Sequence, residues 1–291
     1  MMFITGDRGL SLVYYNAVNE GTRYFRGHPE LESMVIGISG GVDSAITAAL
    51  ANKVVKELER EGRKIKLYGY SLPIISNHED ELKRAALVGT AFCNTFIEYN
   101  MDNAFERLIH SIDGMLTPKD HKVRLGNIKA RLRMIYLYDK ANRYKGLVLS
   151  TDNYTEYLLG FWTLHGDVGD LGFVQELWKT EVYALANWMV ANQLDSRGME
   201  AVLQCIKATP TDGLGVSNSD LDQLFPNWKE YTDSAQQAYR MVDKCLIQYI
   251  YKVPYVQGET TVHTIGEVIN RYENTHYKRE NPFNIQRNRL V

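Results

Sequence analysis

MVIGISGGVDSA, the stretch from residue 34 to residue 45, leads from an apolar run into a helical pattern through three glycines within five residues. An ordinary turn from a strand into a helix needs one glycine at most, because one residue with positive φ can redirect the chain. Beyond the glycines, apolar residues recur at steps of three and four up to Leu58, which is typical of one buried helix face. The stretch therefore predicts a strand, an unusual turn and a helix that begins near Asp43 or Ser44.

Three further short apolar runs follow, at residues 65–70 (IKLYGY), 95–99 (TFIEY) and 147–150 (LVLS). Helical patterns separate them, and the longest extends from Asn127 to Tyr144. Strands and helices that alternate in this way are typical of βαβ units, whose crossovers are right-handed and whose helices cover both faces of a parallel sheet. We therefore predict an α/β fold with a doubly wound, mostly parallel sheet.

The chain outside these units is predicted to be mainly helical. Turn-forming residues crowd between 207 and 220 (KATPTDGLGVSNSD), and no stretch resembles a linker. The additional helices are expected at residues 10–25, 180–192, 234–251 and 262–272. We predict a single domain over residues 1–291, with an α/β core from about 30 to 200 and a helical C-terminal part from about 201 to 291.

Composition and charge limit the class of protein. The 291 residues are 45% hydrophobic, which is enough for a sizeable core, and the net charge of −2 argues against a nucleic-acid binder driven by bulk charge. No apolar run approaches the ~18 residues of a membrane span, and the N-terminus has no secretory pattern. The three cysteines form no CxxC pair, so we expect free buried thiols in a cytoplasmic protein that contacts neither nucleic acid nor membrane.

The glycine turn is predicted to bind phosphate. In open parallel sheets, ligands bind at the carboxyl ends of the strands, and glycines let the backbone approach them closely. The N–H groups of the turn and of the helix N-terminus then form an anion site. Asp43 can be a simple helix cap. Beside phosphates its carboxylate would repel the ligand, unless Mg²⁺ lies between them, since Mg²⁺ takes one or two carboxylates together with phosphate oxygens.

Two better-known phosphate loops do not match. No Gly-Lys dipeptide occurs in the chain, so the Walker A pattern is missing, and Gly37, Gly40 and Gly41 have the wrong spacing for a dinucleotide fingerprint. The SGGxDS pattern that remains resembles the pyrophosphate loop of the ATP pyrophosphatase superfamily. That resemblance implies an adenine nucleotide alpha hydrolase-like fold and cleavage of ATP between its α and β phosphates.

Within this superfamily the chain resembles NAD synthetase. The resemblance rests on the GNIKARLR helix pattern from Gly126, the LVLSTDNYTE segment from Leu147, the GFWTLHGD segment from Gly160, PTDGL from Pro210 and YKR from Tyr277. These segments occur in the family's order over nearly the whole chain. Only 33 residues precede the first predicted strand, so we expect no glutaminase domain and the ammonia-using form.

The resemblance implies a reaction. The family joins ammonia to the nicotinate carboxylate of deamido-NAD after ATP has adenylated that carboxylate, and AMP and pyrophosphate leave. ATP is thus a co-substrate and Mg²⁺ the metal cofactor. The family also forms homodimers with the dinucleotide site at the subunit interface, so we expect a homodimer here. Developing charge lies on phosphate oxygens, so backbone N–H groups and the metal are expected to supply the main catalytic effect.

The resemblance also implies site residues. The metal carboxylates are Asp43 and Glu156, and Asp43 and Lys179 are the catalytic pair. Deamido-NAD is expected to contact Arg131, Asp170 and Lys278, although Asp167 is a rival to Asp170 because the GDVGD segment is one residue short against some relatives. The residues expected to contact ATP are Gly37, Ile38, Ser39, Gly40, Gly41, Val42, Asp43, Ser44, Leu72, Thr151, Lys179 and Thr211.

Several of these residues also have a plain structural explanation. Glu156 and Lys179 could be solvated helix residues, and Arg131 could belong to a charged helix face. Many relatives have an arginine before the Leu-Pro pair where this chain has Ser71, and Tyr277 replaces the usual histidine. Four aromatic residues could stack on a nicotinate ring or belong to the core, namely Tyr136, Tyr138, Phe161 and Trp162.

Two alternative functions differ from NAD synthesis. The first is another amide-forming or tRNA-modifying pyrophosphatase, such as a GMP synthetase-like enzyme. A tRNA-modifying enzyme would predict a basic surface or zinc-binding cysteines, which the sequence lacks. The second is a non-catalytic ATP sensor, which would have no need for a second metal carboxylate beside Asp43 and Lys179.

Overall fold

A computed structural model describes most of the chain. Its described residues are 3–75, 78–113, 122–210, 219–226, 228–253, 262–282 and 284–289. The predicted turn at 207–220 lies largely outside them, and Thr211 lies outside them as well.

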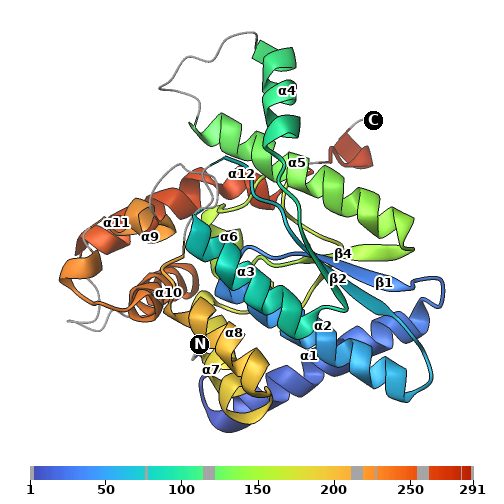
Figure 1. Ribbon diagram of the computed structural model, residues 1–291. Helices are drawn as coiled ribbons and strands as arrows, with labels where there is room; N and C mark the ends of the chain where they lie inside the picture. The colour runs from blue at the N-terminus through green and yellow to red at the C-terminus, as the bar shows by residue number, and fades with distance from the viewer. Residues whose placement is uncertain are drawn as a thin grey trace.

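Five parallel strands form the central sheet, in the order β3-β2-β1-β4-β5. Figure 1 labels β1, β2 and β4 of this sheet. Ser33 of β1 pairs with Lys66 of β2 on one side and with Gly146 of β4 on the other. The order places β1 in the middle, so the sheet is wound in both directions from it. The strands are β1 (Ser33–Gly37), β2 (Lys66–Ser71), β3 (Thr95–Glu98), β4 (Gly146–Ser150) and β5 (Leu171–Gly172).

The four predicted strands are found within about one residue of their expected bounds, and the α/β prediction is confirmed. The two-residue strand β5 was not predicted. The helices are α1 (Asp7–Gly27), α2 (Val42–Arg60), α3 (Glu79–Phe92), α4 (Asp102–Asp113), α5 (Lys122–Arg143), α6 (Tyr154–Leu159), α7 (Lys179–Asn192), α8 (Ser196–Lys207), α9 (Asp220–Leu224), α10 (Ala235–Tyr251), α11 (Val262–Asn274) and α12 (His276–Arg279), with short 3₁₀ turns at Trp228–Glu230 and Arg287–Arg289.

Two hydrophobic clusters cover the two faces of the sheet. Side chains alternate along a strand, so Met34 and Ile36 of β1 face one cluster and Val35 faces the other. The smaller cluster holds residues of α4 and α5, and the larger one holds residues of α1, α2, α3, α7, α8 and α10. The helical C-terminal part shares this larger core through Val242 and Val268.

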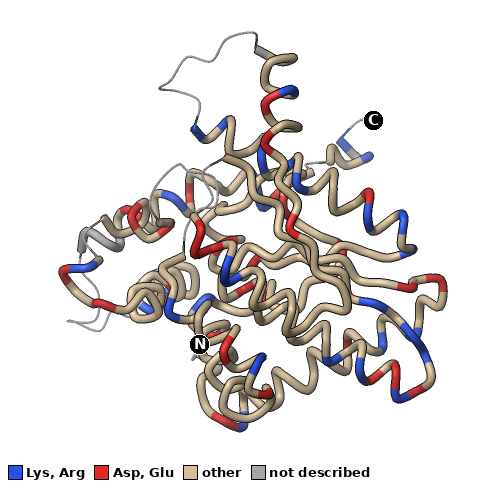
Figure 2. The backbone as a smooth tube through the Cα atoms, viewed as in Figure 1, with Lys and Arg blue, Asp and Glu red and all other residues tan. Residues whose placement is uncertain are grey.

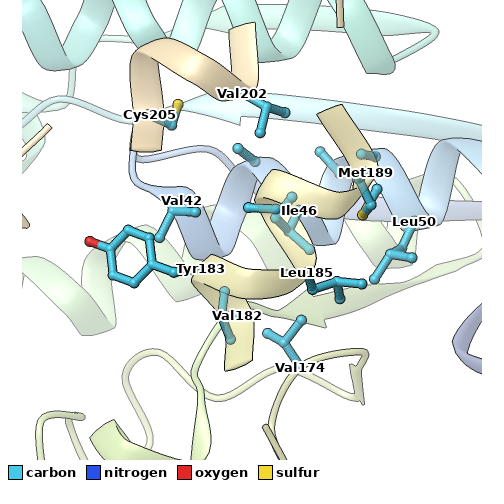
Figure 3. Packing of buried hydrophobic residues seen from close by; sticks show 14 of the residues in the cluster. Val42, Ile46, Leu50, Val174, Val182, Tyr183, Leu185, Met189, Val202 and Cys205 are labelled. Atoms are coloured by element: carbon cyan, nitrogen blue, oxygen red, sulfur yellow. The ribbon is translucent and has the colours of Figure 1, made fainter. Parts of the chain in front are cut away.

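Helix α2 is packed tightly against α7 and α8. In Figure 3, Val42, Ile46 and Leu50 of α2 lie against Tyr183, Leu185 and Met189 of α7 and against Val202 and Cys205 of α8. Val42 is the first residue of α2, and Tyr183 lies in the second turn of α7. This packing brings the starts of the two helices together.

The distribution of charged residues and the free state of the cysteines agree with the expectations from composition. Acidic and basic residues are interspersed along the outer helices (Figure 2). The three cysteines are free, as expected, with Cys205 and Cys245 buried and Cys93 half-buried. None of the described helices has both the length and the apolar character that crossing a membrane would take.

Candidate active site

The glycine turn joins the end of β1 to the start of α2. Ile38 continues the sheet through a 2.8 Å hydrogen bond from its N–H to the oxygen of Tyr70. Gly40 has a φ of 81°, and a Cβ at this position would lie 2.5 Å from the backbone oxygen of Glu81. Only glycine fits this conformation and this close approach of α3. The turn is therefore held in shape by its own sequence and by the first turn of α3.

Local hydrogen bonds shape the rest of the turn. The hydroxyl of Ser44 donates to the oxygen of Gly41 at 3.1 Å, and the Oγ of Ser39 accepts from the N–H of Gly41 at 3.3 Å. The first backbone bond of α2 runs from Ala45 to Gly41, so the N–H groups of the three residues before Ala45 have no partner within the helix. These donors and the positive end of α2 suit an anionic ligand.

A cleft of about 300 Å³ opens beside this turn. It lies at the carboxyl ends of β1, β2 and β4, where ligands bind in open parallel sheets. The cleft brings together most of the residues predicted to contact ATP or metal. Those that line it are Gly37, Ile38, Ser39, Gly40, Gly41, Val42, Asp43, Ser44, Leu72, Thr151, Glu156 and Lys179.

Lys179 lies between the two carboxylates that the sequence assigned to a metal. Its side chain is 2% exposed, and its Nζ donates to a carboxylate oxygen of Asp43 and, at 3.0 Å, to Oε1 of Glu156. Asn153, which caps α6, donates to the other oxygen of Asp43 at 2.8 Å. The starts of α2, α6 and α7 thus meet at one charged cluster, so Lys179 and Glu156 are not solvated helix residues.

The pKa values reflect this crowding of charge. Burial alone would lower the pKa of Lys179, but the carboxylates of Asp43 and Glu156 outweigh it and raise the pKa well above its usual value. Burial raises the pKa of Glu156, and Lys179 opposes that rise. Asp152 has a pKa raised well above its usual range, by burial and by neighbouring carboxylates that include Asp167. The cluster therefore carries several carboxylates around one lysine, so an additional cation would reduce the repulsion between the carboxylates.

Two of the three residues predicted to bind deamido-NAD meet on the loop from residue 160 to residue 167. Arg131 of α5 donates from Nε to the oxygen of Leu164 at 3.2 Å. Lys278 of α12 donates to the oxygens of Gly160 at 2.6 Å and Trp162 at 2.5 Å. Helices far apart in the sequence therefore hold the same loop.

Asp167 and Asp170 have different environments. Asp167 lines the cleft and accepts hydrogen bonds from the N–H of Thr163 at 2.8 and 3.0 Å. Burial raises its pKa to about 7, although the Thr163 bonds and Lys278 oppose the rise. Asp170 instead accepts from the hydroxyl of Tyr138 at 2.8 Å and from the N–H of Val148 at 2.9 Å, away from the cleft lining. Of the two carboxylates, Asp167, the rival residue, is therefore the one that lines the cleft.

Two arginines in the cleft were not assigned from the sequence. Arg84 of α3 donates from Nε to the oxygen of Gly40 at 2.9 Å, so its guanidinium lies beside the glycine turn. Arg133 of α5 donates from Nε to the oxygen of Leu72 at 2.9 Å, and burial lowers its pKa to about 10. Arg133 thus brings a cation next to Leu72 and Ser71. The ARLR pattern contained Arg133, but no local signal distinguished Arg84.

The aromatic candidates divide between the cleft and its surroundings. Phe161 lines the cleft, and the guanidinium of Arg271 lies 3.6 Å from its ring centre. Tyr136 stacks on Tyr99, and Trp162 stacks on Tyr157, outside the cleft lining. Phe161 is therefore the aromatic residue of the four that is placed to meet a bound ring.

Comparisons with known proteins agree with this geometry. The family model described as NAD synthase matches residues 22–282. A protein of Thermoplasma volcanium named NH(3)-dependent NAD(+) synthetase is 32% identical over 68% of this chain and 74% of its own length. A protein of the same name from Thermococcus kodakarensis is 34% identical over 77% of this chain and 82% of its own length.

Solved structures share the fold. NMN synthetase from Francisella tularensis superposes with a TM-score of 0.72 at 22% identity, over 95% of this chain and 98% of its own. An NH3-dependent NAD synthetase from Campylobacter jejuni has a TM-score of 0.68 at 20% identity, over 95% of this chain and 99% of its own. Because the family model spans most of the chain, including all five strands and the residues that line the cleft, this chain belongs to the NAD synthase family.

Proposed function

We propose that the protein joins ammonia to the nicotinate carboxylate of deamido-NAD and splits ATP into AMP and pyrophosphate. The observation that carries this proposal is the cluster of Lys179, Asp43 and Glu156 at the mouth of the glycine turn. Cleavage of a nucleoside triphosphate is favoured by N–H groups and a cation that stabilise charge on the phosphates, and by carboxylates that hold a metal ion. This cleft combines all of these groups. Family membership and the names of the relatives from Thermoplasma volcanium and Thermococcus kodakarensis support the same reaction.

The first half of the reaction forms the adenylate. A carboxylate oxygen of nicotinate attacks the α-phosphorus of ATP, a C–O–P linkage forms, and pyrophosphate departs with the electrons of the broken P–O bond. The N–H groups of the turn and Lys179 stabilise the negative charge that leaves with pyrophosphate. Arg84, beside the glycine turn, and Arg133, beside Leu72, add positive charge to the cleft.

Magnesium fits the carboxylates of this cluster. Among the described residues, no group of three or more His, Cys, Asp or Glu side chains could hold a metal by itself. Mg²⁺ needs only one or two carboxylates when phosphate oxygens and water complete its shell, and Asp43 and Glu156 supply two. When bound there, Mg²⁺ would neutralise charge on the phosphate oxygens.

The second half of the reaction transfers nitrogen. Ammonia attacks the carbonyl carbon of the adenylate, the C–O bond to AMP breaks, and the new amide loses a proton. Asp167 lines the cleft with a pKa raised to about 7, so its carboxylate can accept a proton from ammonium near neutral pH. Arg131 and Lys278 hold the 160–167 loop and face the dinucleotide in this proposal, while Asp170 supports that loop from the sheet.

We further propose that the protein forms a homodimer in the cytoplasm. Helix α5 carries Arg131 and also exposes apolar side chains, with Ile135 65% exposed and Val123 59% exposed. Covering this helix with a second copy would bury those side chains. The three free cysteines are in keeping with a reducing compartment. Light scattering of the purified protein tests the dimer, and a monomer at all concentrations would contradict it.

One assay tests the proposed reaction. Purified protein is incubated with ATP, magnesium and deamido-NAD, together with either ammonium or glutamine, and NAD, AMP and pyrophosphate are measured. We expect equal amounts of the three products with ammonium and far less with glutamine. ATP that binds without AMP release would instead indicate the sensor.

The acceptor distinguishes the remaining alternatives. Nicotinate mononucleotide replaces deamido-NAD in a parallel reaction, because a protein named NMN synthetase shares this fold. Xanthosine monophosphate tests a GMP synthetase-like activity. A higher kcat/KM for either acceptor than for deamido-NAD would overturn the proposal.

A further inference from the structure

A buried carboxylate on α10 lies behind the charged cluster, and no motif of the sequence pointed to it. Asp243 is fully buried. Its Oδ1 accepts from the hydroxyl of Thr155 at 2.6 Å, and its Oδ2 accepts from both the N–H and the hydroxyl of Thr180, at 2.8 and 2.6 Å. A charge in the core is costly unless such donors surround it, so this residue is held for a reason beyond filling space.

The two threonines adjoin the residues of the charged cluster. Thr155 directly precedes Glu156 on α6, and Thr180 directly follows Lys179 on α7. The N–H of Lys179 itself donates to the Oγ1 of Thr155 at 2.8 Å. Asp243 therefore connects the backbone positions from which Glu156 and Lys179 extend.

These bonds also occupy the N-terminus of α7. The first N–H groups of a helix have no partner within it. Here Thr155 takes the N–H of Lys179, and Asp243 takes the N–H of Thr180. The positive end of the helix dipole stabilises the carboxylate of Asp243 in return. The N-terminus of α7 is thus fixed by the protein itself, and the side chain of Lys179 is directed to the cleft.

Helix α10 also contacts the other end of Lys179. Tyr239 lies four residues before Asp243 and so on the same helix face. The Nζ of Lys179 lies 5.4 Å from the centre of the Tyr239 ring, within range of a cation–π interaction. One face of α10 therefore supports both the backbone and the ammonium group of Lys179.

We infer that Asp243 is a positioning residue, which fixes Lys179 and Glu156 relative to each other, so that Lys179 meets the phosphates of ATP while Glu156 is held where it would bind their magnesium ion. The inference rests on the proposed function, because it assigns Asp243 to the adenylation step. The C-terminal helical part thereby becomes part of the ATP machinery, although Asp243 touches no substrate.

Three variants at two adjacent positions, 242 and 243, test this role. Asp243→Ala removes all three bonds. Asp243→Asn can still accept both Thr180 bonds with its amide oxygen and donate to the hydroxyl of Thr155. Val242→Ala is the matched control, because Val242 is fully buried on the same helix but belongs to the hydrophobic cluster. Thermal unfolding, calorimetric titration with ATP, and kcat and KM are measured for each.

The expected pattern separates positioning from stability. Asp243→Ala lowers kcat for AMP release by about 10- to 100-fold, because small misplacements of catalytic groups have effects of that size. It also weakens ATP binding, while KM for deamido-NAD stays within about twofold of wild type. Asp243→Asn recovers most of kcat. Val242→Ala lowers the unfolding temperature and leaves kcat unchanged. An equal kcat for Asp243→Ala and Val242→Ala would overturn the inference.

A second pair of variants serves if Asp243→Ala does not fold. Thr155→Val keeps the shape of the side chain and removes the hydroxyl, whereas Thr155→Ser keeps the hydroxyl. We expect a lower kcat for Thr155→Val than for Thr155→Ser at equal unfolding temperature, and equal kcat values would refute the link. Failure of the wild-type protein to release AMP would instead refute the proposed function, so the two failures are distinguishable.

Discussion

The Nζ of Lys179 lies 3.0 Å from Oε1 of Glu156 and also contacts Asp43, and all three side chains are largely buried. A buried lysine between two carboxylates balances their charge only in part, so the cluster keeps a net negative charge. The carboxylates would repel a nucleoside triphosphate that enters this cleft alone, whereas a bound divalent cation would offset that repulsion. The arrangement therefore favours ATP together with magnesium over free ATP.

Replacing Lys179 with Met should affect both stability and catalysis. The two carboxylates would lose their buried partner, so we expect the free energy of unfolding to fall by about 3 kcal/mol. AMP release should fall by about 100-fold or more, because a fixed positive charge at the departing pyrophosphate is lost. Chemical denaturation and the AMP assay measure the two effects.

Lys53→Met is the control for this variant. Lys53 forms a partly exposed pair with Glu57 on α2, which should contribute under about 1 kcal/mol. A Lys179→Met protein that resembled this control in both measurements would show that the buried cluster has no special role.

Asp43→Asn should abolish adenylation and leave the fold intact. The amide oxygen of Asn can still accept the bond from Asn153, and Lys179 keeps its bond to Glu156, but the amide nitrogen then faces Lys179 and the charge beside Lys179 and the metal is lost. We expect AMP release near background and a cooperative unfolding transition at a lower temperature than that of wild type. Asp139→Asn, at an exposed position of α5, is the control and should have full activity. NAD formation by Asp43→Asn at the native rate would disprove the metal role.

The sequence predicted the central sheet and the phosphate turn because both are local. The strands are continuous apolar runs. Position 40 requires glycine because the backbone there has a positive φ and lies close to α3. Helices α4 and α8 were not predicted although both are amphipathic, whereas α6 and α9 are too short for periodicity to be informative. The sequence is thus most informative where one segment alone determines the conformation.

The missed site residues depend on contacts between distant segments. Asp243 meets Thr155 across 88 positions, and Arg84 reaches Gly40 across 44. The difference between Asp167, which lines the cleft, and Asp170, which is bound by Tyr138 and Val148 outside its lining, depends on the path of the loop between them. Tertiary structure alone could supply these relationships.

Arg84 and Arg131 should affect different substrates. Arg84 lies beside the glycine turn, so Arg84→Ala should raise KM for ATP by about tenfold, the size expected for one lost charged hydrogen bond. Arg131 holds the loop that we propose faces the dinucleotide, so Arg131→Ala should raise KM for deamido-NAD by a similar factor. Steady-state kinetics with each substrate varied in turn measure the two effects. Each variant is the control for the other, and an equal rise in both KM values for either protein would contradict its assignment.

The pH dependence should report on Asp167. Its pKa is raised to about 7 in the folded protein, mainly by burial, whereas an unfolded Asp has a pKa of about 4. The folded state therefore holds this proton more tightly, so the contribution of Asp167 to stability is greatest below about pH 4 and is lost as the pH rises to 7. The unfolding free energy of the wild type should thus fall between these values relative to that of Asp167→Asn.

Catalysis should change with pH in the opposite direction. The ionised carboxylate is the form that accepts a proton from ammonium, so kcat/KM for ammonium should rise from pH 6 to pH 8 in the wild type. Asp167→Asn should have a lower and flatter profile, after correction for the fraction of free ammonia. The control is Asp170→Asn, whose carboxylate accepts bonds from Tyr138 and Val148 away from the cleft lining. If Asp170→Asn flattened the profile and Asp167→Asn did not, the proton acceptor would be Asp170, and the loop would have to rearrange when substrate binds.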